Sequence, residues 1–265
     1  MGSGIFGLGT RAMSAAQVNL DTISHNISNV NTPGYSRQTV VLQTVQGQFT
    51  GGGYIGQGVD VQTILRNQSE LLTRQSAAAG STQAADAIRA QRLSQLQEVF
   101  SGGSQGLGAA INDMMNAFSD VVSSPTDITA RTVVLTRMDE TAARMRTASD
   151  RINEIEYTVK EQLQSSVTAI NSLATQMAAI NEQIARATGN GQSPNDLLDQ
   201  RDQMLKDLNK LVRVSTLTQG DGSFNVFIGN GQPLVVGTQS YQLQAVASRA
   251  STNEGCEWTL GSVNE

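Results

Sequence analysis

The feature that most constrains this chain is a long stretch without glycine or proline, from about Asp127 to Thr188. Apolar residues recur in it at steps of three, four or seven, which places them on one side of an α-helix. Such a helix would extend roughly 90 Å, more than a globular domain needs. We therefore expect a mainly α fold, an extended helical bundle or coiled-coil rod. The apolar positions are Met138, Ala142, Met145, Ile152, Ile155, Val159, Leu163, Val167, Ile170, Leu173, Met177, Ile180 and Ile184.

The rest of the chain differs in character before and after this helix. Upstream, apolar periodicity predicts shorter helices, and downstream the apolar residues alternate as in strands. The pairs Asp221-Gly222 and Asn230-Gly231 predict hairpin turns there. We expect an N-terminal helix with an extended loop, a rod-shaped helical domain, and a β-hairpin region that is the truncated start of an outer domain. The expected bounds are 1–66, 67–212 (with the long helix at about 127–188) and 213–265, and the shorter helices cover about 3–30, 68–100 and 108–122.

One more helix is expected after residue 193 and runs to about Leu211. Ser193 is predicted to cap it, and Pro194 to occupy its first position, where a missing N–H group costs little. Asp202 and Lys206 stand four residues apart in the order that favours an ion pair on a helix surface.

The N-terminal helix carries a thin apolar stripe whose spacing is nearer to an eleven-residue repeat than to a strict heptad. Its other side holds Asn, Gln, Ser and Thr in place of Lys and Glu, and such a helix is marginal in water. We expect residues 1 to about 33 to become ordered only in an assembly, although a core helix of an ordinary bundle remains the alternative. The stripe consists of Ile5, Leu8, Ala12, Ala16, Leu20, Ile23, Ile27 and Val30.

The end of this helix is rich in amides, which supports the assembly interpretation. Asn26, Asn29 and Asn31 would be costly to bury without hydrogen-bond partners. We expect neighbouring subunits to supply those partners. Pro33-Gly34 then ends the helix and permits a turn.

Composition and motifs argue against several classes of function. Charged residues make up 15% of the chain, the net charge is -5 and the pI is about 5.0, so a nucleic-acid-binding surface is not expected. The glycine-rich loop at 51–58 lacks the Gly-Lys-Ser/Thr ending of a phosphate cradle. No apolar run is long enough to span a membrane, and the first ten residues do not resemble a secretory signal peptide.

Catalytic and metal-binding residues are scarce. His25 is the single histidine and Cys256 the single cysteine, so the chain offers no disulfide and no cluster with metal-ligand spacing. His25 lies in the polar helix end, where polar contact or exposure is expected rather than general-base catalysis. We expect no enzyme activity, no cofactor and no metal.

Three motifs resemble one family. The run Ile23 to Tyr35 (ISHNISNVNTPGY) is similar to the N-terminal signature of bacterial flagellar axial proteins, which include rod, hook and hook-associated subunits. Its continuation Ser36-Arg37-Gln38 resembles the first hook-associated protein family, found at the hook–filament junction. So do residues 56–59 with 64–66, and a third run that rod and hook proteins lack. That third run is Ser193, Pro194, Asn195, Asp196, Leu197, Leu198, Asp199, Gln200, Arg201 and Asp202.

The resemblance implies a structural subunit that joins hook to filament. It implies that the N-terminal helix packs in the axial core of the flagellum and that Pro33-Gly34 is the hinge between this helix and the outer part of the subunit. It also implies that the chain is an N-terminal portion, because family members continue for several hundred residues. The expected assembly residues are Ile5, Leu8, Leu20, Ile23, Asn26, Ile27, Asn29 and Val30.

The resemblance also implies partners and a location. The partners are the hook protein, the next hook-associated protein on the filament side, other copies of the chain, and the flagellar type III export apparatus with an export chaperone whose site lies in the absent C-terminal part. The protein is made in the cytoplasm and exported to the extracellular flagellum. Two alternatives stay open: a hook or rod axial protein, and a free-standing helical bundle that acts as an adaptor or an enzyme.

Overall fold

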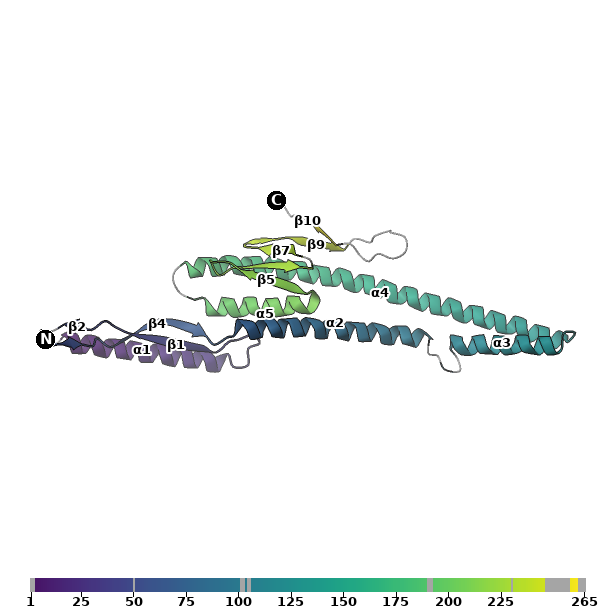
Figure 1. The fold of residues 1–265 in the computed structure, drawn as a ribbon, viewed down its shortest axis with the longest axis horizontal. Coiled ribbons are helices and arrows are strands. Elements are labelled where there is room, and N and C mark those ends of the chain that lie inside the picture. The colour runs from purple at the N-terminus through teal and green to yellow at the C-terminus, as the bar shows by residue number, and fades with distance from the viewer. Residues whose placement is uncertain are drawn as a thin grey trace. The chain divides into compact units, whose positions relative to one another are not determined.

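The computed structural model describes residues 3–49, 51–100, 103, 106–189, 193–229, 231–245 and 258–261 (Figure 1). By contacts the chain divides into two compact units, one of residues 1–82 with 168–265 and one of residues 83–167. The elements are α1 (Ser3–Ser28), β1 (Gln38–Thr44), β2 (Gln48–Phe49), β3 (Tyr54–Ile55), β4 (Val59–Arg66), α2 (Glu70–Phe100), α3 (Leu107–Ser123), α4 (Ile128–Thr188), α5 (Asn195–Leu211), β5 (Val214–Thr218), β6 (Phe224–Ile228), β7 (Gln232–Val236), β8 (Gln239–Ser240), β9 (Gln242–Ala245) and β10 (Trp258–Gly261).

The expected mainly α fold is confirmed, with α4 as a single helix of 61 residues followed by strand hairpins. Asp127 begins it as predicted for a helix-start residue, because its Oδ1 accepts the backbone N–H of Thr129 at 2.8 Å. The division into segments 1–66, 67–212 and 213–265 stays a prediction.

In the unit of residues 83–167, α3 packs on α4 through small side chains. Ala110 and Ala117 of α3 are buried, as are Val134, Thr141 and Ala148 of α4. In each helix these positions lie seven residues apart, the repeat of a coiled-coil seam. Thr141 Oγ1 donates to the carbonyl oxygen of Ala110 at 3.2 Å, which fixes the register of the two helices.

In the other unit, the C-terminal part of α4 and α5 form a core with an antiparallel sheet of order β5-β6-β7-β8. Ile170, Ala174, Met177, Ile180 and Ile184 point from α4 into this core, and Leu205 and Leu208 from α5 join them. Val226, Leu234 and Val235 supply the sheet side. This core therefore rests on the same apolar positions that predict the helix.

Two asparagine side chains of α4 form hydrogen bonds with the backbone of the strand region. Asn181 is fully buried, and its Nδ2 donates to the carbonyl oxygens of Phe224 and Gly237, each at 2.8 Å. Asn171 exchanges two hydrogen bonds with the backbone of Leu243, at 2.8 and 3.0 Å. These two amides therefore fix the position of α4 against the strand region.

The N-terminal region of the same unit is a helix on a hairpin. β1 pairs antiparallel with β4, with a register shift between Val41 and Leu42, and β2 pairs with β3 beyond it. α1 contacts both long strands of the hairpin and runs along it (Figure 1). Ala15 and Thr22 are the buried residues of α1 on this side.

Several local expectations are wrong. α1 ends at Ser28, not Val30, and the loop at 51–58 contains β3. α5 begins at Asn195 with Pro194 in the N-cap position, while Ser193 Oγ donates to Asn195 Oδ1 at 2.9 Å and caps no backbone N–H group. The hydroxyl of Ser193 is used by the Asn195 side chain, and Asn195 in turn bonds to Ile64 of β4.

The predicted turn at Asp221-Gly222 is confirmed. Gly222 has φ +82°, a left-handed value that favours glycine, and Asp221 Oδ1 accepts the N–H of Ser223 at 2.9 Å. Asn230 lies outside the described residues, and Gly231 precedes β7 with φ +100°.

Replacing Asn181 by Ala should destabilise the unit that contains the sheet. The change leaves the buried backbone of Phe224 without its partner and opens a small cavity, with an expected loss of about 2–3 kcal/mol. Gln176→Ala, at an exposed position of the same helix, should change the unfolding free energy by less than about 0.5 kcal/mol. Urea unfolding measures both, and equal stability of the two variants would contradict the assignment.

Candidate functional site

The first motif, residues 64–66 of the second and the third motif meet at one place in the unit that contains α1, α5 and the sheet, whereas residues 56–59 of the second bond elsewhere, to Arg11, Val45 and Gln48. We call this place the motif junction. Residues of the first motif and of β4 face one side of α5, and the contacts between them are hydrogen bonds and ion pairs. The motif junction consists of His25, Asn26, Tyr35, Ser36, Gln38, Ile64, Arg66, Gln68, Asn195, Asp196, Asp199 and Asp202.

Arg66 is the centre of the motif junction. A single guanidinium nitrogen, Nη1, donates to Asp199 Oδ1 at 2.8 Å and to Asp202 Oδ2 at 2.9 Å. The three side chains are nearly closed to solvent, with exposed fractions of 13%, 7% and 10%. Buried charges of this kind must be paired and hydrogen-bonded, because desolvation would otherwise disfavour the folded state strongly.

Asp199 also joins the first motif to this ion pair. Its second oxygen, Oδ2, accepts the backbone N–H of Ser36 at 2.8 Å, across 163 positions of sequence. Asp202 has a parallel role toward α2, since its Oδ2 accepts Gln68 Nε2 at 2.9 Å. Asp202 therefore pairs with Arg66 and not, as predicted, with Lys206, because a buried cation offers a stronger bond than a solvated one.

The start of α5 binds both strands of the hairpin. Asn195 Nδ2 donates to the carbonyl oxygen of Ile64 at 2.8 Å, and Gln38 Nε2 donates to Asp196 Oδ1 at 2.9 Å. His25 Nε2 lies 3.4 Å from the same Asp196 oxygen, with both side chains partly exposed. The expectation of polar contact for His25 is therefore confirmed.

The Asn26 side chain has hydrogen-bond partners within its own chain. The expectation that a neighbouring subunit supplies these partners is therefore wrong for Asn26. Its Nδ2 donates to the carbonyl oxygen of Gln38 at 2.9 Å, and its Oδ1 accepts the Tyr35 hydroxyl at 2.7 Å and the N–H of Gln38 at 2.8 Å. Asn29 Nδ2 donates to the carbonyl oxygen of His25 at 3.0 Å. The turn that follows α1 thus folds back on Asn26, while Asn29 bonds within the helix end. For Asn31 the partner in a neighbouring subunit stays a prediction.

Arg201 extends the motif junction to the sheet. Its Nη1 donates to the carbonyl oxygen of Gly222 at 2.7 Å, and its guanidinium carbon lies 3.5 Å from the centre of the Phe224 ring. Burial lowers the pKa of Arg201, and nearby Asp202 acts in the opposite direction. The family motif on α5 thus contacts the hairpin on one side and the sheet on the other.

Pro33 and Gly34 lie against α5. Gly34 has φ +83°, and a Cβ there would come within 2.9 Å of Gln203 Oε1. Only glycine fits this turn without strain or displacement of Gln203. The hinge role of the pair stays a prediction.

Leu197 and Leu198 of the third motif are half-buried. The side chain of Ile5 lies outside the described residues, as does Cys256.

The apolar stripe of α1 is exposed. Leu20, Ile23, Ile27 and Val30 are more than half exposed, and Leu8 is 41% exposed although its Cδ1 lies close to Gly58 of the hairpin. Two further apolar residues, Phe6 and Met13, were not predicted as part of the stripe, and they are 78% and 74% exposed. Leu8 and Ala12 of the predicted stripe are exposed too, so the eleven-residue spacing stays a prediction. A heptad series with steps of three and four lies on the same exposed side. It runs through Phe6, Gly9, Met13, Ala16, Leu20, Ile23, Ile27 and Val30.

The positions in and directly after α1 that are mostly closed to solvent form its inward face. They are Gly7, Arg11, Ala15, Val18, Asn19, Thr22, His25, Asn26 and Asn29. This face is small and polar, so the helix buries its polar side and leaves its apolar side uncovered.

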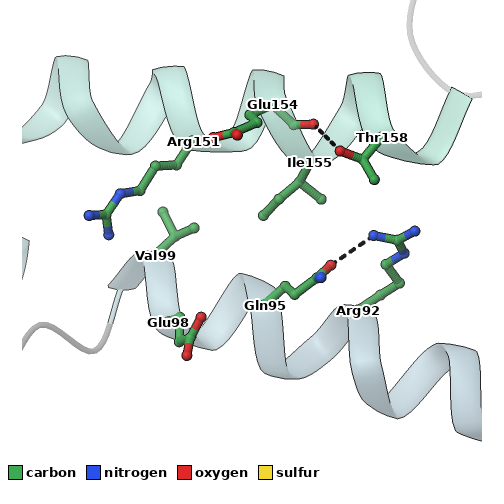
Figure 2. A pocket seen from close by; sticks show the side chains of 8 residues that line it. All are labelled: Arg92, Gln95, Glu98, Val99, Arg151, Glu154, Ile155 and Thr158. Atoms are coloured by element: carbon green, nitrogen blue, oxygen red, sulfur yellow. Dashed lines mark hydrogen bonds between the residues drawn. The ribbon is translucent and has the colours of Figure 1, made fainter. Parts of the chain in front are cut away.

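A groove of about 400 Å³ lies between α2 and α4 in the unit of residues 83–167. Figure 2 shows Val99 and Ile155 pointing toward one another there, while Arg92 bonds to Gln95 on its own helix. Charges of both signs surround it, from Arg92, Glu98, Arg151 and Glu154, with no nucleophile beside a base. Within the described residues no group of His, Cys, Asp and Glu has the arrangement of a metal site, and no helix is both long and apolar enough for a membrane span.

Comparison with known proteins identifies the family. The helical-domain model of the flagellar hook-associated protein FlgK matches residues 93–265, and a flagellar basal body rod protein model matches residues 8–35. The chain belongs to the flagellar hook-associated protein FlgK family. The rod protein match covers residues 23–35 of the first motif, and the helical-domain match covers the third motif at 193–202.

Individual relatives carry the same description. Flagellar hook-associated protein 1 of Salmonella typhimurium is 35% identical over 240 residues, which are 90% of this chain and 43% of that protein. The Bacillus subtilis protein of the same name is 28% identical, over 92% of this chain and 49% of its own length. The solved flagellar hook junction protein FlgK of Burkholderia pseudomallei matches with a TM-score of 0.55 and 32% identity, over 72% of this chain and 32% of that chain. The chain thus spans less than half the length of these curated relatives.

Replacing Asp199 by Ala should destabilise the motif junction more than any surface charge change. It removes the acceptor for Ser36 and half of the pairing of buried Arg66, with an expected loss of about 3 kcal/mol. Asp207→Ala, which breaks an exposed pair with Lys210 on the same helix, should cost less than about 1 kcal/mol. Denaturant unfolding compares the two, and a similar cost for both would refute a central role of Asp199.

Alkaline pH should weaken the turn after α1 through Tyr35. Partial burial, with the Asp196 and Asp199 carboxylates nearby, raises the pKa of the Tyr35 hydroxyl above its ordinary 10.0. Its stabilising contribution is therefore complete below that value and disappears as pH rises through the raised pKa, since the unfolded chain ionises first. The difference in unfolding free energy between the natural protein and Tyr35→Phe should shrink across this range, and a constant difference would contradict the assignment.

Proposed function

We propose that this protein is a structural subunit at the junction of the flagellar hook and filament. The observation that carries the proposal is the inverted orientation of α1, which places its small polar face on its own hairpin and its apolar heptad stripe in solvent. Large apolar side chains arranged in one uncovered line are typical of an interaction surface.

The heptad spacing of the stripe indicates the kind of surface it accepts. Steps of three and four keep one face toward a second helix in a left-handed coiled coil. Each large side chain that becomes fully buried contributes about 1.5–3 kcal/mol, so the whole stripe stabilises an assembly strongly. We infer that Ile5, Leu8, Leu20, Ile23, Ile27 and Val30, together with Phe6 and Met13, pack in the axial core of the flagellum.

The motif junction would transmit load from this helix. Its ion pairs join the α1 hairpin to α5, and Arg201 joins α5 to the sheet, so a force on α1 reaches the sheet through buried bonds. Ser193, Pro194, Asn195, Asp196, Leu197, Leu198, Arg201 and Asp202 thus serve as a rigid connection. The turn at Pro33-Gly34 serves as the hinge where α1 adjusts its direction.

The partners follow from this role. We infer that the subunit binds hook protein on one side and the next hook-associated protein on the other, and that it contacts its own copies through two different surfaces, the arrangement that builds open helical assemblies. It would reach the extracellular flagellum through the type III export apparatus with the help of an export chaperone. The role requires no catalysis, cofactor or nucleic acid.

The alternatives find less support. A hook or rod protein accounts for the match over residues 8–35 but not for the helical-domain match over 93–265. A free-standing adaptor or enzyme accounts for neither the helical-domain match over 93–265 nor the rod protein match over 8–35.

Polar substitution of the stripe should abolish assembly without unfolding the subunit. Leu20→Ser with Ile27→Ser, in the full-length protein of a strain that lacks its own junction protein, should reduce swimming at least tenfold. Their exposed side chains make few contacts within the subunit, so circular dichroism should not change. Gln17→Ala with Ser24→Ala, also exposed on α1, is the matched control and should swim normally. Normal swimming of the Ser variant would refute the proposed role of the stripe.

A further inference from the structure

A small cavity lies beside the motif junction, between the start of α2, the middle of α5 and the sheet. We call it the arginine cavity, because Arg66, Arg74 and Arg201 line it together with Glu70 and Asp202. Its volume is about 60 Å³, which is roughly the share of two water molecules in the liquid. The arginine cavity therefore has room for one small ligand.

Arg201 brings a buried hydrogen-bond donor without a partner to the arginine cavity. The residue is only 4% exposed, and its Nη1 and Nη2 donate to the Gly222 carbonyl oxygen and to Asp202 Oδ1. Its Nε is the one buried side-chain nitrogen or oxygen that lacks a hydrogen-bond partner among the described residues. A buried N–H group without an acceptor is unfavourable, so a ligand that accepts it would stabilise the folded unit.

Other polar groups around the arginine cavity are donors as well. Arg66 forms both of its hydrogen bonds with described residues through Nη1, which leaves its Nε and Nη2 to donate elsewhere. Thr73 Oγ1 accepts Gln68 Nε2 at 3.0 Å, so its own hydrogen is available. Both oxygens of Asp202 already accept hydrogen bonds, Oδ1 from Arg201 and Oδ2 from Arg66. A ligand here meets several N–H and O–H groups but few free oxygens.

This imbalance favours an anion over water. A buried water molecule forms about three hydrogen bonds, and its own two hydrogens need acceptors. In the lining only Glu70, at an exposed position, has a carboxylate that forms no hydrogen bond with a described residue. An anion accepts several hydrogen bonds and has none to donate, so it suits a cavity of donors.

Charge indicates the same kind of ligand. The lining has three arginines and two acids, and so carries one surplus positive charge. Asp199 pairs with Arg66 from outside the lining, so the second charge of a divalent anion would not be compensated. Burial lowers the pKa of Arg201, and the like charge of Arg66 lowers it further, so the cation gains from a negative neighbour.

We propose that the arginine cavity is a binding site for one small monovalent anion, of the size of chloride or formate, which accepts the Nε–H of Arg201 and N–H groups of Arg66. The bound anion connects α2 and α5 to the sheet, in addition to the bonds that Asp202 makes. This site goes beyond the proposed role in the flagellum and does not depend on it.

Hydrogen exchange of α5 in the full-length protein, followed by mass spectrometry, tests the proposal. Replacement of about 100 mM sodium gluconate, whose anion is too large for the cavity, by the same concentration of sodium chloride should slow exchange of peptides from residues 195–211 at least threefold. The reason is that an anion bound only by the folded unit opposes its opening.

Two arginine variants on α2 separate this site from a general effect of salt. Arg74→Gln removes an exposed charge of the lining and should reduce the chloride response to less than half. Arg89→Gln, at an exposed position of the same helix outside the lining, is the matched control and should keep the full response. Equal chloride responses of the natural protein and the Arg74 variant, or no response at all, would overturn the proposal.

Bromide gives a direct measurement that needs no variant. In crystals of the full-length protein grown with sodium bromide, the anomalous scattering of bromide should give a peak in the arginine cavity, within hydrogen-bond distance of Arg201 Nε. An ordered water molecule without anomalous signal at that position, or a carboxylate from another part of the full-length protein in the cavity, would overturn the proposal.

Discussion

The buried sharing of Arg66 between Asp199 and Asp202 is the interaction on which the arrangement of this unit depends. Transfer of three charges from water is unfavourable, and their mutual attraction compensates only when the geometry is good and the remaining polar atoms are bonded. Both conditions hold, since Ser36 and Gln68 donate to the same carboxylates. The ion pairs of Arg66 therefore mainly fix the orientation of the hairpin relative to α5, because these charged groups are all satisfied together in one relative position.

That fixed position explains how one helix can present two different faces. The inward face of α1 is short enough, with Ala15 and Thr22 buried, to lie close to the strands, and only the end of Leu8 reaches the hairpin at Gly58 among the large apolar side chains described. The turn at 29–38 bonds back to Asn26 and closes the polar end of the helix. The outward heptad is then free to meet another helix without competition from the subunit's own core.

Much of the fold follows from the sequence, and the reasons differ by element. α4 is predicted because periodicity over a long segment averages out local exceptions, and the hairpin turn at Asp221-Gly222 because its geometry demands these residue types. The residues of the motifs are visible in the sequence, but their meeting is not, since Ser36 and Asp199 are 163 positions apart and no local pattern encodes their bond. The sequence likewise does not predict that Pro194 is the N-cap of α5 or that Asp202 pairs with Arg66. In both cases, contacts with other elements override the local preference. Phe6 and Met13 could have been found by testing the strict heptad.

Hydrogen exchange at the Ser36 amide, measured by NMR in dilute monomeric protein, tests this account most directly. That N–H group is bonded to Asp199 of α5 and to no strand partner in the described structure, so its protection reports the bridge itself. The account predicts exchange as slow as that of amides in the centre of α5, with both accelerated together when Asp199 is changed. Exchange of Ser36 at the rate of an unprotected peptide, while α5 remains protected, would show that the α1 hairpin is not joined to α5 in the free subunit.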